Sequence, residues 1–362
     1  MAEQRPRVLV LLKTLGVGGA EMLVLQSARL WDSKSFDYRL AYLGGPDELT
    51  EKFSDEGIAP IRLSPGASAN DPRAALALRR YLRERGVELI HAHLAQPALT
   101  AHYARRGLGT RLVATNHCIE ASMREATRWI AHAAWPRADA VIAVGDAVAA
   151  ETKNANTRVL ANGVELARFS GAEPAELGVP TEAAVVLVLA NLLEVKRPLE
   201  ILGVFERACG HAGSGAHLVF AGDGPLRTAL ERAREKSPHR DHIHILGRRN
   251  DVPALVTRAD VVMLLSRAEG LPMSLLEAAA AGTALLATKV ASIGSLIKDG
   301  ETGLLAGNDE EAAAQLARLL SDRALRERLG KAAQKFVAEH FNLETNVRAT
   351  EALYREVLGG AA

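Results

Sequence analysis

Residues 266–288 read SRAEGLPMSLLEAAAAGTALLAT and place two acids, Glu269 and Glu277, around an otherwise apolar run. Proline is tolerated in the first turn of a helix and poorly further in, so we expect a helix from about Pro272 to Ala281. Glu269 then lies on the loop before the helix, and Glu277 lies within it. The free N–H groups at the start of such a helix form an anion site. The alternative is an ordinary strand-to-helix unit whose acids are solvated.

The chain has the size and composition of a globular protein with two domains. Its 362 residues suit two hydrophobic cores, and 48% apolar with 24% charged residues is ordinary for such proteins. The formal net charge of +1 offers no global attraction for nucleic acid. Two cysteines, Cys118 and Cys209, favour a reducing compartment over a disulfide framework. No apolar segment approaches the ~20 residues that span a bilayer. We expect a cytoplasmic protein, either free or peripheral on the inner face of the membrane.

Short apolar runs alternate with amphipathic stretches along the whole chain, which predicts an α/β fold with two doubly wound parallel sheets. Strand candidates in the first half are RVLVLL, YRLAYL, IRL, ELIHAH, RLVAT, AVIAV and RVL. Those in the second half are AVVLVLAN, AHLVFAGDG, IHILG, DVVMLLS, TALLAT and TGLLA. Helical patterns in the first half cover 19–32, 72–86, 95–106 and 121–135. This order predicts two facing Rossmann-like domains with a cleft between them.

Periodicity lapses over residues 160–184, where Gly, Pro and Ala predict a turn and a linker. We therefore place an N-terminal domain at 1–163 and a C-terminal domain at 164–342. The last three helical patterns, which no strand follows, cover about 309–321, 323–339 and 345–358. The segment from about 343 to 362 is expected to cross back to the N-terminal domain.

Three glycines follow the first strand in the stretch KTLGVGGAEMLV. Gly16, Gly18 and Gly19 let the backbone approach a ligand closely, and the helix start offers N–H donors to a phosphate or a sugar. The dinucleotide-binding fingerprint needs a third glycine at a place where this stretch lacks it, and no acid closes the second strand. Both absences argue against a nicotinamide-dependent dehydrogenase.

Lys196 and Arg197 stand between a strand and a helix in LVLANLLEVKRPLEIL. Cations at the carboxyl end of a parallel strand face the crevice where ligands bind, and phosphate is a natural partner for such a lysine. The alternative is a solvated charge pair at a helix start. Gly222, Gly224 and Gly247 also end strands, where bare backbone could border a flat nucleobase.

Six motifs occur in a fixed order along the chain. They are GGAE after the first strand, NGVExxRF at the linker, KRP, AGDGP, GRRNDV, and EGLPMSLLE followed by AAAAG. In this order they resemble the motifs of the retaining glycosyltransferases of family GT4, which have the GT-B fold. The resemblance implies transfer of a sugar from a nucleotide-diphosphate sugar, UDP favoured and GDP second, to a hydroxyl acceptor. Such enzymes serve cell-surface glycan, glycolipid and natural-product synthesis.

The resemblance implies catalytic roles for three residues. Glu269 matches a glutamate that contacts the donor sugar, Lys196 a basic residue that neutralises the leaving diphosphate, and His117 a histidine near the sugar. Glu277 matches a glutamate that accepts hydrogen bonds from the ribose. The donor-binding residues are Gly18, Gly19, Asn191, Arg197, Gly222, Gly224, Arg248, Gly270, Leu271, Pro272, Met273, Ser274, Leu275 and Glu277. For His117, a capping or structural role stays open.

Asn191 and Leu193 depart from the family pattern, because many members have an arginine at the first position and some at the second. Asparagine can hydrogen-bond a phosphate but brings no charge, so diphosphate neutralisation rests chiefly on Lys196. The amides of Ser274 and Leu275 are expected to hold the distal phosphate. Preorganised amides and a lysine would stabilise the departing diphosphate without a metal or cofactor. With the second glutamate facing the ribose, retention through a same-face substitution is expected rather than a glycosidase-like double displacement.

The acceptor side falls to the first domain. Its segment 119–140, IEASMREATRWIAHAAWPRADA, is amphipathic, basic and aromatic. It could rest on an anionic membrane or hold a lipid-linked acceptor, or it could simply pack on the sheet. We assign Arg124, Arg128 and His93 to the acceptor side, which could receive a sugar, a lipid-linked or a small-molecule acceptor. His91 is interpreted as structural.

Three other functions fit the same scaffold less well. A sugar-nucleotide epimerase would bind the same donor but transfer to no acceptor. A pyridoxal-phosphate phosphorylase would need a Schiff-base lysine and a much longer chain. A non-catalytic sugar-nucleotide sensor stays open, although the presence of Glu269, Glu277 and Lys196 argues against it. Transfer to an added acceptor separates the glycosyltransferase from all three.

Overall fold

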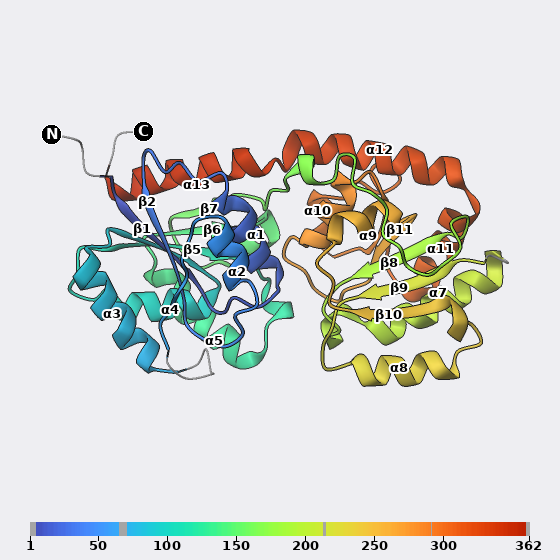
Figure 1. The fold of residues 1–362 in the computed structure, drawn as a ribbon, viewed down its shortest axis with the longest axis horizontal. Helices are drawn as coiled ribbons and strands as arrows, with labels where there is room; N and C mark the ends of the chain where they lie inside the picture. The colour runs from blue at the N-terminus through green and yellow to red at the C-terminus, as the bar shows by residue number, and fades with distance from the viewer. Residues whose placement is uncertain (1–4, 65–70, 213–214, 291, 360–362) are drawn as a thin grey trace. The chain divides into compact units, whose positions relative to one another are not determined.

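The computed structural model describes residues 5–64, 71–212, 215–290 and 292–359. It divides into two compact units. The first unit comprises Met1–Gly163 with Leu343–Ala362, and the second comprises Val164–Asn342. Each unit is a parallel sheet with helices on both faces, so the predicted α/β class is confirmed (Figure 1).

The first unit contains a parallel sheet of seven strands in the order β3-β2-β1-β4-β5-β6-β7. The strands are β1 Arg7–Leu12, β2 Asp37–Tyr42, β3 Ile61–Arg62, β4 Leu89–His93, β5 Arg111–Asn116, β6 Ala140–Ala143 and β7 Thr157–Val159. The helices are α1 Gly19–Ala28, α2 Thr50–Asp55, α3 Arg73–Arg85, α4 Ala95–Ala104, α5 Glu125–Ala134, α6 Asp146–Glu151 and α13 Leu343–Leu358. All seven strands lie at the expected places.

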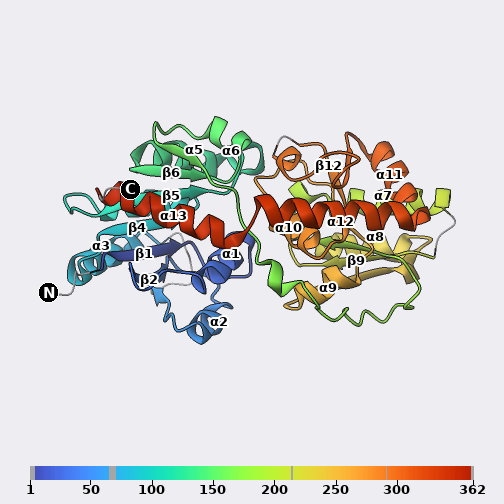
Figure 2. The same cartoon turned by 90° about the horizontal axis from the view of Figure 1, so that it is seen from above.

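Side chains of β1 alternate between the two faces of the first sheet. Leu9 and Leu11 join a buried cluster with α3, α4 and α5, whereas Val10 and Leu12 join a second cluster with α1. This alternation is the two-residue period of a strand that is covered on both sides. Figure 2 shows α13 lying over this sheet, where Tyr354 packs with Val8 and other strand residues.

Helix α13 is anchored by one buried acid. Glu351 is 1% exposed, and its Oε1 accepts hydrogen bonds from the Asp32 backbone N–H (2.8 Å) and the Tyr38 hydroxyl (2.9 Å). The Arg348 guanidinium donates to the other carboxylate oxygen at 3.0 Å. A buried carboxylate that is paired and hydrogen-bonded in this way avoids its desolvation cost. The last helix is therefore an integral part of the first unit.

The second unit contains a parallel sheet of six strands in the order β10-β9-β8-β11-β12-β13. The strands are β8 Val185–Leu189, β9 His217–Ala221, β10 Ile243–Gly247, β11 Val261–Leu264, β12 Ala284–Thr288 and β13 Leu304–Ala306. The α-helices are α7 Pro198–Ala212, α8 Arg227–Lys236, α9 Val252–Arg258, α10 Met273–Ala280, α11 Asp309–Ser321 and α12 Arg323–His340. Helices α7, α8 and α11 share one hydrophobic core with alternate strand residues.

Helix α10 packs against α12, and both views in Figures 1 and 2 show the two helices side by side. Gly330 of α12 lies so close to the end of α10 that a Cβ atom there would sit 1.9 Å from the Gly282 carbonyl oxygen. The Gln334 side chain donates a hydrogen bond of 2.9 Å to the Ala280 carbonyl, one of the open acceptors at the α10 C-terminus. These contacts fix the helix whose start was predicted to bind an anion.

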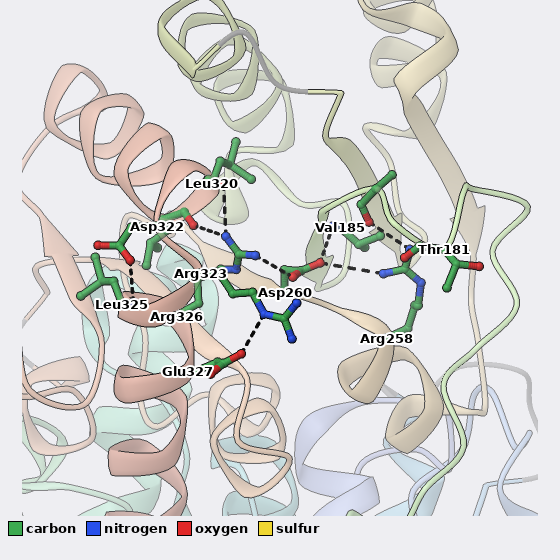
Figure 3. A network of polar contacts seen from close by, with 12 residues as sticks. Thr181, Val185, Arg258, Asp260, Leu320, Asp322, Arg323, Leu325, Arg326 and Glu327 are labelled. Atoms are coloured by element: carbon green, nitrogen blue, oxygen red, sulfur yellow. Dashed lines mark hydrogen bonds and ion pairs between the residues drawn. The ribbon is translucent and has the colours of Figure 1, made fainter.

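An ion-pair network ties the amino ends of β8 and β11 to α12 (Figure 3). Asp260, which precedes β11, accepts from the Val185 N–H at 2.9 Å and from Arg326 of α12 at 3.2 Å. Arg258 lies 3.9 Å from the same carboxylate and donates to carbonyls of the incoming linker, including that of Ala183 at 3.1 Å. Asp322 caps α12 through the Leu325 N–H. This network lies at the edge opposite the strand ends that bind ligands in such sheets, so we assign it to stability.

Two predicted helices are shorter in the structure. The pattern over 121–135 forms α5 only from Glu125, because Arg124 is extended with φ −66° and ψ 152°. Its far end passes into a 3₁₀ turn at Trp135, where Pro136 cannot continue the α-helical hydrogen bonds. The pattern over 19–32 ends as a helix at Ala28. The linker contains the 3₁₀ turn Leu166–Arg168 and an isolated β-bridge between Val164 and Asn342.

We predict that Gly330→Ala lowers the free energy of unfolding by about 1–3 kcal/mol, because the new methyl group meets rigid backbone. Urea unfolding of purified protein measures this. Gly210→Ala in α7 is the matched control, since a Cβ there meets nothing within 4 Å. The control should be stabilised by up to about 1 kcal/mol, because alanine is the better helix former. Equal behaviour of the two variants would contradict the close α10–α12 contact.

Candidate active site

The second sheet reverses its winding between β8 and β11. In the order β10-β9-β8-β11-β12-β13, the chain first winds outward from β8 and then returns to place β11 on the other side of it. Loops that leave the carboxyl ends of the two central strands diverge at such a point and leave room for a ligand. Lys196 lies on the loop after β8, and Glu269 lies on the loop after β11. The topology therefore accounts for their meeting.

Lys196 and Glu269 form an ion pair in which the ammonium Nζ contacts Oε1 of the carboxylate. The side chains are 22% and 9% exposed, so the pair is largely shielded from water. The two loops are also joined by a backbone hydrogen bond of 2.9 Å from the Arg267 N–H to the Val195 carbonyl. The Ser292 hydroxyl donates to the Glu269 carbonyl and fixes the backbone of the acid.

Helix α10 begins at Met273, one residue after the expected start, with Pro272 as an extended N-cap and no side-chain cap. The Leu275 and Leu276 N–H groups donate to the Pro272 carbonyl at 3.2 and 3.3 Å and close the first turn. The Leu275 amide, which was predicted to hold the distal phosphate, therefore has a partner within the helix, and its contact with a donor stays a prediction. The amides that precede the first turn are those of Met273 and Ser274, which keeps the anion site at this helix start.

Arg197, which was predicted to contact the donor, has acidic partners in this structure. It adopts a left-handed backbone with φ 56°, and its Nη2 lies 2.9 and 2.8 Å from the two carboxylate oxygens of Asp309 at the start of α11. Glu200 lies 3.6 Å from its Nε. A guanidinium held by two acids is committed to structure, so we assign Arg197 to holding the loop that carries Lys196.

Gly222 and Gly224 are required by contact between loops. A Cβ at Gly222 would lie 1.9 Å from the Ala190 carbonyl oxygen, and one at Gly224 would lie 2.7 Å from that of Leu192. The Gly222 N–H also donates to the Gly247 carbonyl at 2.8 Å. The loops after β8, β9 and β10 are thus joined through bare backbone, which explains these glycines without a ligand. Their contact with a donor stays a prediction.

The remaining predicted donor residues of the second unit differ in exposure. Asn191 and Arg248 are exposed at the ends of β8 and β10. Glu277 is 8% exposed and lies in the second turn of α10. Gly270, Leu271 and Pro272, on the loop before α10, are buried. Glu269 lies on the loop before α10 and Glu277 lies within the helix, as predicted from the quoted stretch.

In the first unit, the glycine-rich loop follows β1 at the equivalent winding reversal between β1 and β4. Gly18 is the N-cap of α1, and Gly19 is its first residue. A Cβ at Gly18 would lie 2.5 Å from Oε2 of Glu21, so the acid of the GGAE motif covers this glycine. Burial raises the pKa of Glu21, and the Thr14 hydroxyl donates to it at 3.3 Å. Contact of the loop with a phosphate stays a prediction.

Three histidines lie together at the carboxyl ends of β4 and β5. His93 Nδ1 is 3.0 Å from His117 Nε2, with the two rings stacked. His91 lies between the Tyr354 hydroxyl, 2.5 Å from its Nδ1, and the Thr115 hydroxyl, 2.6 Å from its Nε2. The structure thus brings the two predicted site histidines into one pair, while His91 has the saturated contacts of a structural residue.

Burial holds all three imidazoles in the neutral form. It lowers the pKa of His91 to about 3 and that of His117 to about 4. The pKa of His93 also lies well below its ordinary value, because of burial and the two neighbouring histidines. A neutral imidazole can donate from one nitrogen and accept at the other, so the pair can present a hydrogen bond to a sugar hydroxyl.

The histidines border a cavity of about 40 Å³ within the first unit, enough for one to three waters. Helix α13 supplies Glu351 and Tyr354 to its wall. Sequence reasoning missed both residues and their contacts with β2 and β4. The available signal was the spacing of Val347, Glu351, Tyr354 and Leu358, an apolar helical stripe that contains a single acid.

Arg124 and Arg128, the predicted acceptor-side arginines, are exposed at the start of α5. Trp129 beside them is 72% exposed, whereas Ala131 and Ala134 are buried against the sheet and α4. The aromatic ring therefore does not pack on the sheet. Trp135 at the end of the segment is buried in the same core, so the segment packs on the sheet through one face and leaves Trp129 exposed on the other. Contact with a membrane or a lipid-linked acceptor stays a prediction.

The protein thus consists of two α/β units, each with a doubly wound parallel sheet. The winding reversal of the second sheet brings together a cation, a carboxylate and the start of a helix, which suits a phosphate-bearing ligand. Residues 170–336 match the model of the glycosyl transferases group 1, and residues 17–168 match that of Glycosyltransferase Family 4. The chain belongs to the GT4 group 1 glycosyltransferases, so the predicted family and the glycosyltransferase class of activity are confirmed.

The chain is similar to known proteins over nearly its full length. It is 24% identical to the N-acetyl-alpha-D-glucosaminyl L-malate synthase of Bacillus anthracis, over 94% of this chain and 95% of the relative. Sucrose-phosphate synthase from Thermosynechococcus elongatus matches with a TM-score of 0.84 and 19% identity, over 98% and 100% of the two chains. HepE of Anabaena in complex with UDP-glucose matches with a TM-score of 0.82 and 18% identity, over 96% and 99%. The fold is GT-B.

We predict that acid destabilises the first unit through its neutral histidines. In the unfolded chain a histidine has a pKa near 6.5, whereas folded His91 has a pKa of about 3. Below about pH 6.5 the unfolded state therefore takes up a proton that the folded state refuses, and stability falls as pH falls toward 3. Between pH 7.5 and 5.5 this histidine alone should lower the free energy of unfolding by about 1.4 kcal/mol.

Urea unfolding at the two pH values tests this prediction. The loss of stability on acidification should be smaller in His91→Gln than in the wild type by about that amount. His340→Gln removes an exposed histidine and controls for the substitution itself. An unchanged loss in His91→Gln would show that its imidazole is accessible to protons in the folded protein.

Proposed function

We propose that the protein transfers a sugar, with retention of anomeric configuration, from a nucleotide-diphosphate sugar to a hydroxyl acceptor. The observation that carries this proposal is the position of Lys196, Glu269 and the start of α10 around one winding reversal. A lysine and free amides suit a diphosphate, while a buried carboxylate suits sugar hydroxyls. Glu277, further along α10, is assigned to the ribose.

Charge stabilisation is the chemical role we assign to this site. As the glycosyl–phosphate bond breaks, negative charge accumulates on the diphosphate. The Lys196 ammonium and the Met273 and Ser274 amides are positioned to stabilise this charge, a role that requires no divalent cation or cofactor. The only other carboxylate assigned to the donor, Glu277, is reserved for the ribose, so we favour substitution on one face of the sugar over a double displacement.

A UDP-sugar is the favoured donor, with a GDP-sugar second. The solved HepE of Anabaena that shares this fold contains UDP-glucose, which supports a uridine donor by analogy. The Bacillus anthracis relative joins an N-acetylglucosaminyl group to L-malate, by its name, which supports a small hydroxylated acceptor. Another relative, from Campylobacter jejuni, is named for a polyprenyl-linked acceptor, so a lipid-linked glycan is the second acceptor class.

The first test is binding of UDP-, GDP-, ADP- and dTDP-sugars, followed as a rise in Tm. A ligand at 100 times its Kd stabilises the folded protein by about 2.7 kcal/mol. We predict that one nucleotide class stabilises the wild type and that Lys196→Ala weakens its binding about 10- to 100-fold, because a charge-assisted contact is lost. Glu277→Ala should weaken the same class.

Lys236→Ala, at the exposed end of α8, is the matched control for loss of a lysine and should bind like the wild type. Incubation of the best donor with malate, simple glycosides and polyprenyl phosphates then tests transfer, and NMR of the product tests retention. Nucleotide binding without release of nucleoside diphosphate to any acceptor would contradict the transferase proposal. An inverted product would contradict retention alone.

We also propose that α5 rests on an anionic membrane when the acceptor is lipid-linked. Within the described residues, every helix is too short or too polar to span a bilayer. An outward tryptophan beside two arginines suits the interface between lipid headgroups and water. Trp129, Arg124 and Arg128 are therefore assigned to peripheral contact.

Sedimentation with phosphatidylglycerol vesicles measures this contact. Trp129→Ala should reduce the bound fraction several-fold, and removal of each arginine should cost about fivefold, because a basic residue contributes about 1 kcal/mol near an anionic surface. Leu199→Ala removes another partly exposed apolar side chain, on α7, as the control. Equal binding by all variants would exclude α5 as the contact.

A further inference from the structure

Lys196 and Glu269 form an ion pair with each other, although the proposed function assigns them to different parts of the donor. Lys196 is assigned to the diphosphate and Glu269 to the sugar, yet in this structure they contact each other. The carboxylate is the more deeply buried partner, with 9% of its side chain exposed. Among the ion pairs of the described residues, Glu269 has no second cationic partner. Its charge therefore depends on Lys196.

The backbone around the pair keeps the two charges together. The Arg267 N–H to Val195 carbonyl bond joins the two loops directly, two residues before Glu269 and one before Lys196. Arg197, next to the lysine, is held by Asp309, and the Glu269 carbonyl is held by Ser292. These bonds fix the backbone positions of Lys196 and Glu269, while the lysine side chain itself can still reorient. A diphosphate that approaches Lys196 must therefore compete with a fixed carboxylate.

The cost of that competition depends on what the diphosphate carries. If a bare nucleoside diphosphate takes Lys196, Glu269 stays shielded from water without a full partner, which is unfavourable for a buried charge. If the diphosphate carries a sugar, the sugar hydroxyls can donate to Glu269 and replace the lost contact. The same two residues thus respond differently to donor and to spent nucleotide.

We propose that the Lys196–Glu269 ion pair selects the sugar-bearing donor over the bare nucleoside diphosphate and promotes release of the nucleoside diphosphate after transfer. This inference rests on the proposed function and adds a mechanism of product release to it. Before transfer, the sugar compensates Glu269 while the diphosphate holds Lys196. Once the sugar has left, Glu269 regains Lys196 and displaces the diphosphate.

Calorimetric titration with two ligand pairs tests the inference, UDP against UDP-glucose and GDP against GDP-mannose. Glu269→Gln keeps the size of the side chain but removes the competing charge. We expect the nucleoside diphosphate of the preferred pair to bind this variant about tenfold more tightly than the wild type, which corresponds to about 1.4 kcal/mol. The sugar nucleotide should gain less or lose affinity, so the preference for the sugar falls.

Glu194→Gln is the matched control. Glu194 lies on the same 3₁₀ turn as Lys196, and its side chain is 83% exposed, with Arg267 at 3.7 Å. The substitution changes the net charge of the loop equally but leaves the shielded pair intact. It should change diphosphate affinity less than twofold. A gain equal to that of Glu269→Gln would overturn the inference, because general charge would then explain the effect.

The wild type supplies a second readout that does not depend on the folding of a variant. The sugar nucleotide of the preferred pair must bind more tightly than its nucleoside diphosphate, and equal or reversed affinities would overturn the inference. Unchanged or weaker diphosphate binding by folded Glu269→Gln would also overturn it while leaving the proposed function intact. Failure of the wild type to bind either pair or any other sugar nucleotide would overturn both.

Discussion

The contact between Lys196 and Glu269 exists because β8 and β11 are neighbours in the second sheet although 71 residues separate the end of one from the start of the other. From β8 the chain adds β9 and β10 on one side of the sheet and then returns to place β11 on the other side. The loops that follow β8 and β11 therefore run in opposite directions and leave a gap between them. The asparagine, lysine and glutamate of the site all stand on those loops. Arg197, Asp309, Ser292 and the glycines at 222 and 224 then serve to hold the loops in place.

Much of the fold follows from patterns that operate within a few residues. Strands β1 to β13 lie within the predicted runs or extend at most one residue beyond them, because each is an apolar stretch bounded by turn residues. The start of α10 was predictable because proline restricts where a helix can begin. The roles of individual side chains were less accessible, since they depend on partners distant in sequence. Arg197 has the sequence context of a phosphate ligand, and only the position of Asp309, 112 residues later, shows its structural engagement.

In the first unit, too, the contacts of individual side chains depend on residues distant in sequence. The position of His93 and His117 at the ends of adjacent strands follows from a parallel sheet, while their pairing at 3.0 Å was not predicted. The Tyr354 hydroxyl that contacts His91 comes from 263 residues further along the chain. A local pattern cannot anticipate a contact of that kind. The apolar stripe of α13 predicts that the helix packs on a surface, while the identity of that surface is set by Glu351 and its partners on the first sheet.

Because α13 belongs to the first unit, that unit begins to be synthesised first but is completed last. The ribosome delivers every strand of the first sheet before it begins β8, yet Asp32, Tyr38 and His91 receive their helical partners only after the whole second unit has emerged. The second unit can close its core first, from one unbroken segment. Until α13 has been synthesised, the face of the first sheet that it covers stays exposed. A chain interrupted after residue 342 would keep the second unit but lose α13, the helix that covers the histidines, so completion of the first unit depends on these 16 residues.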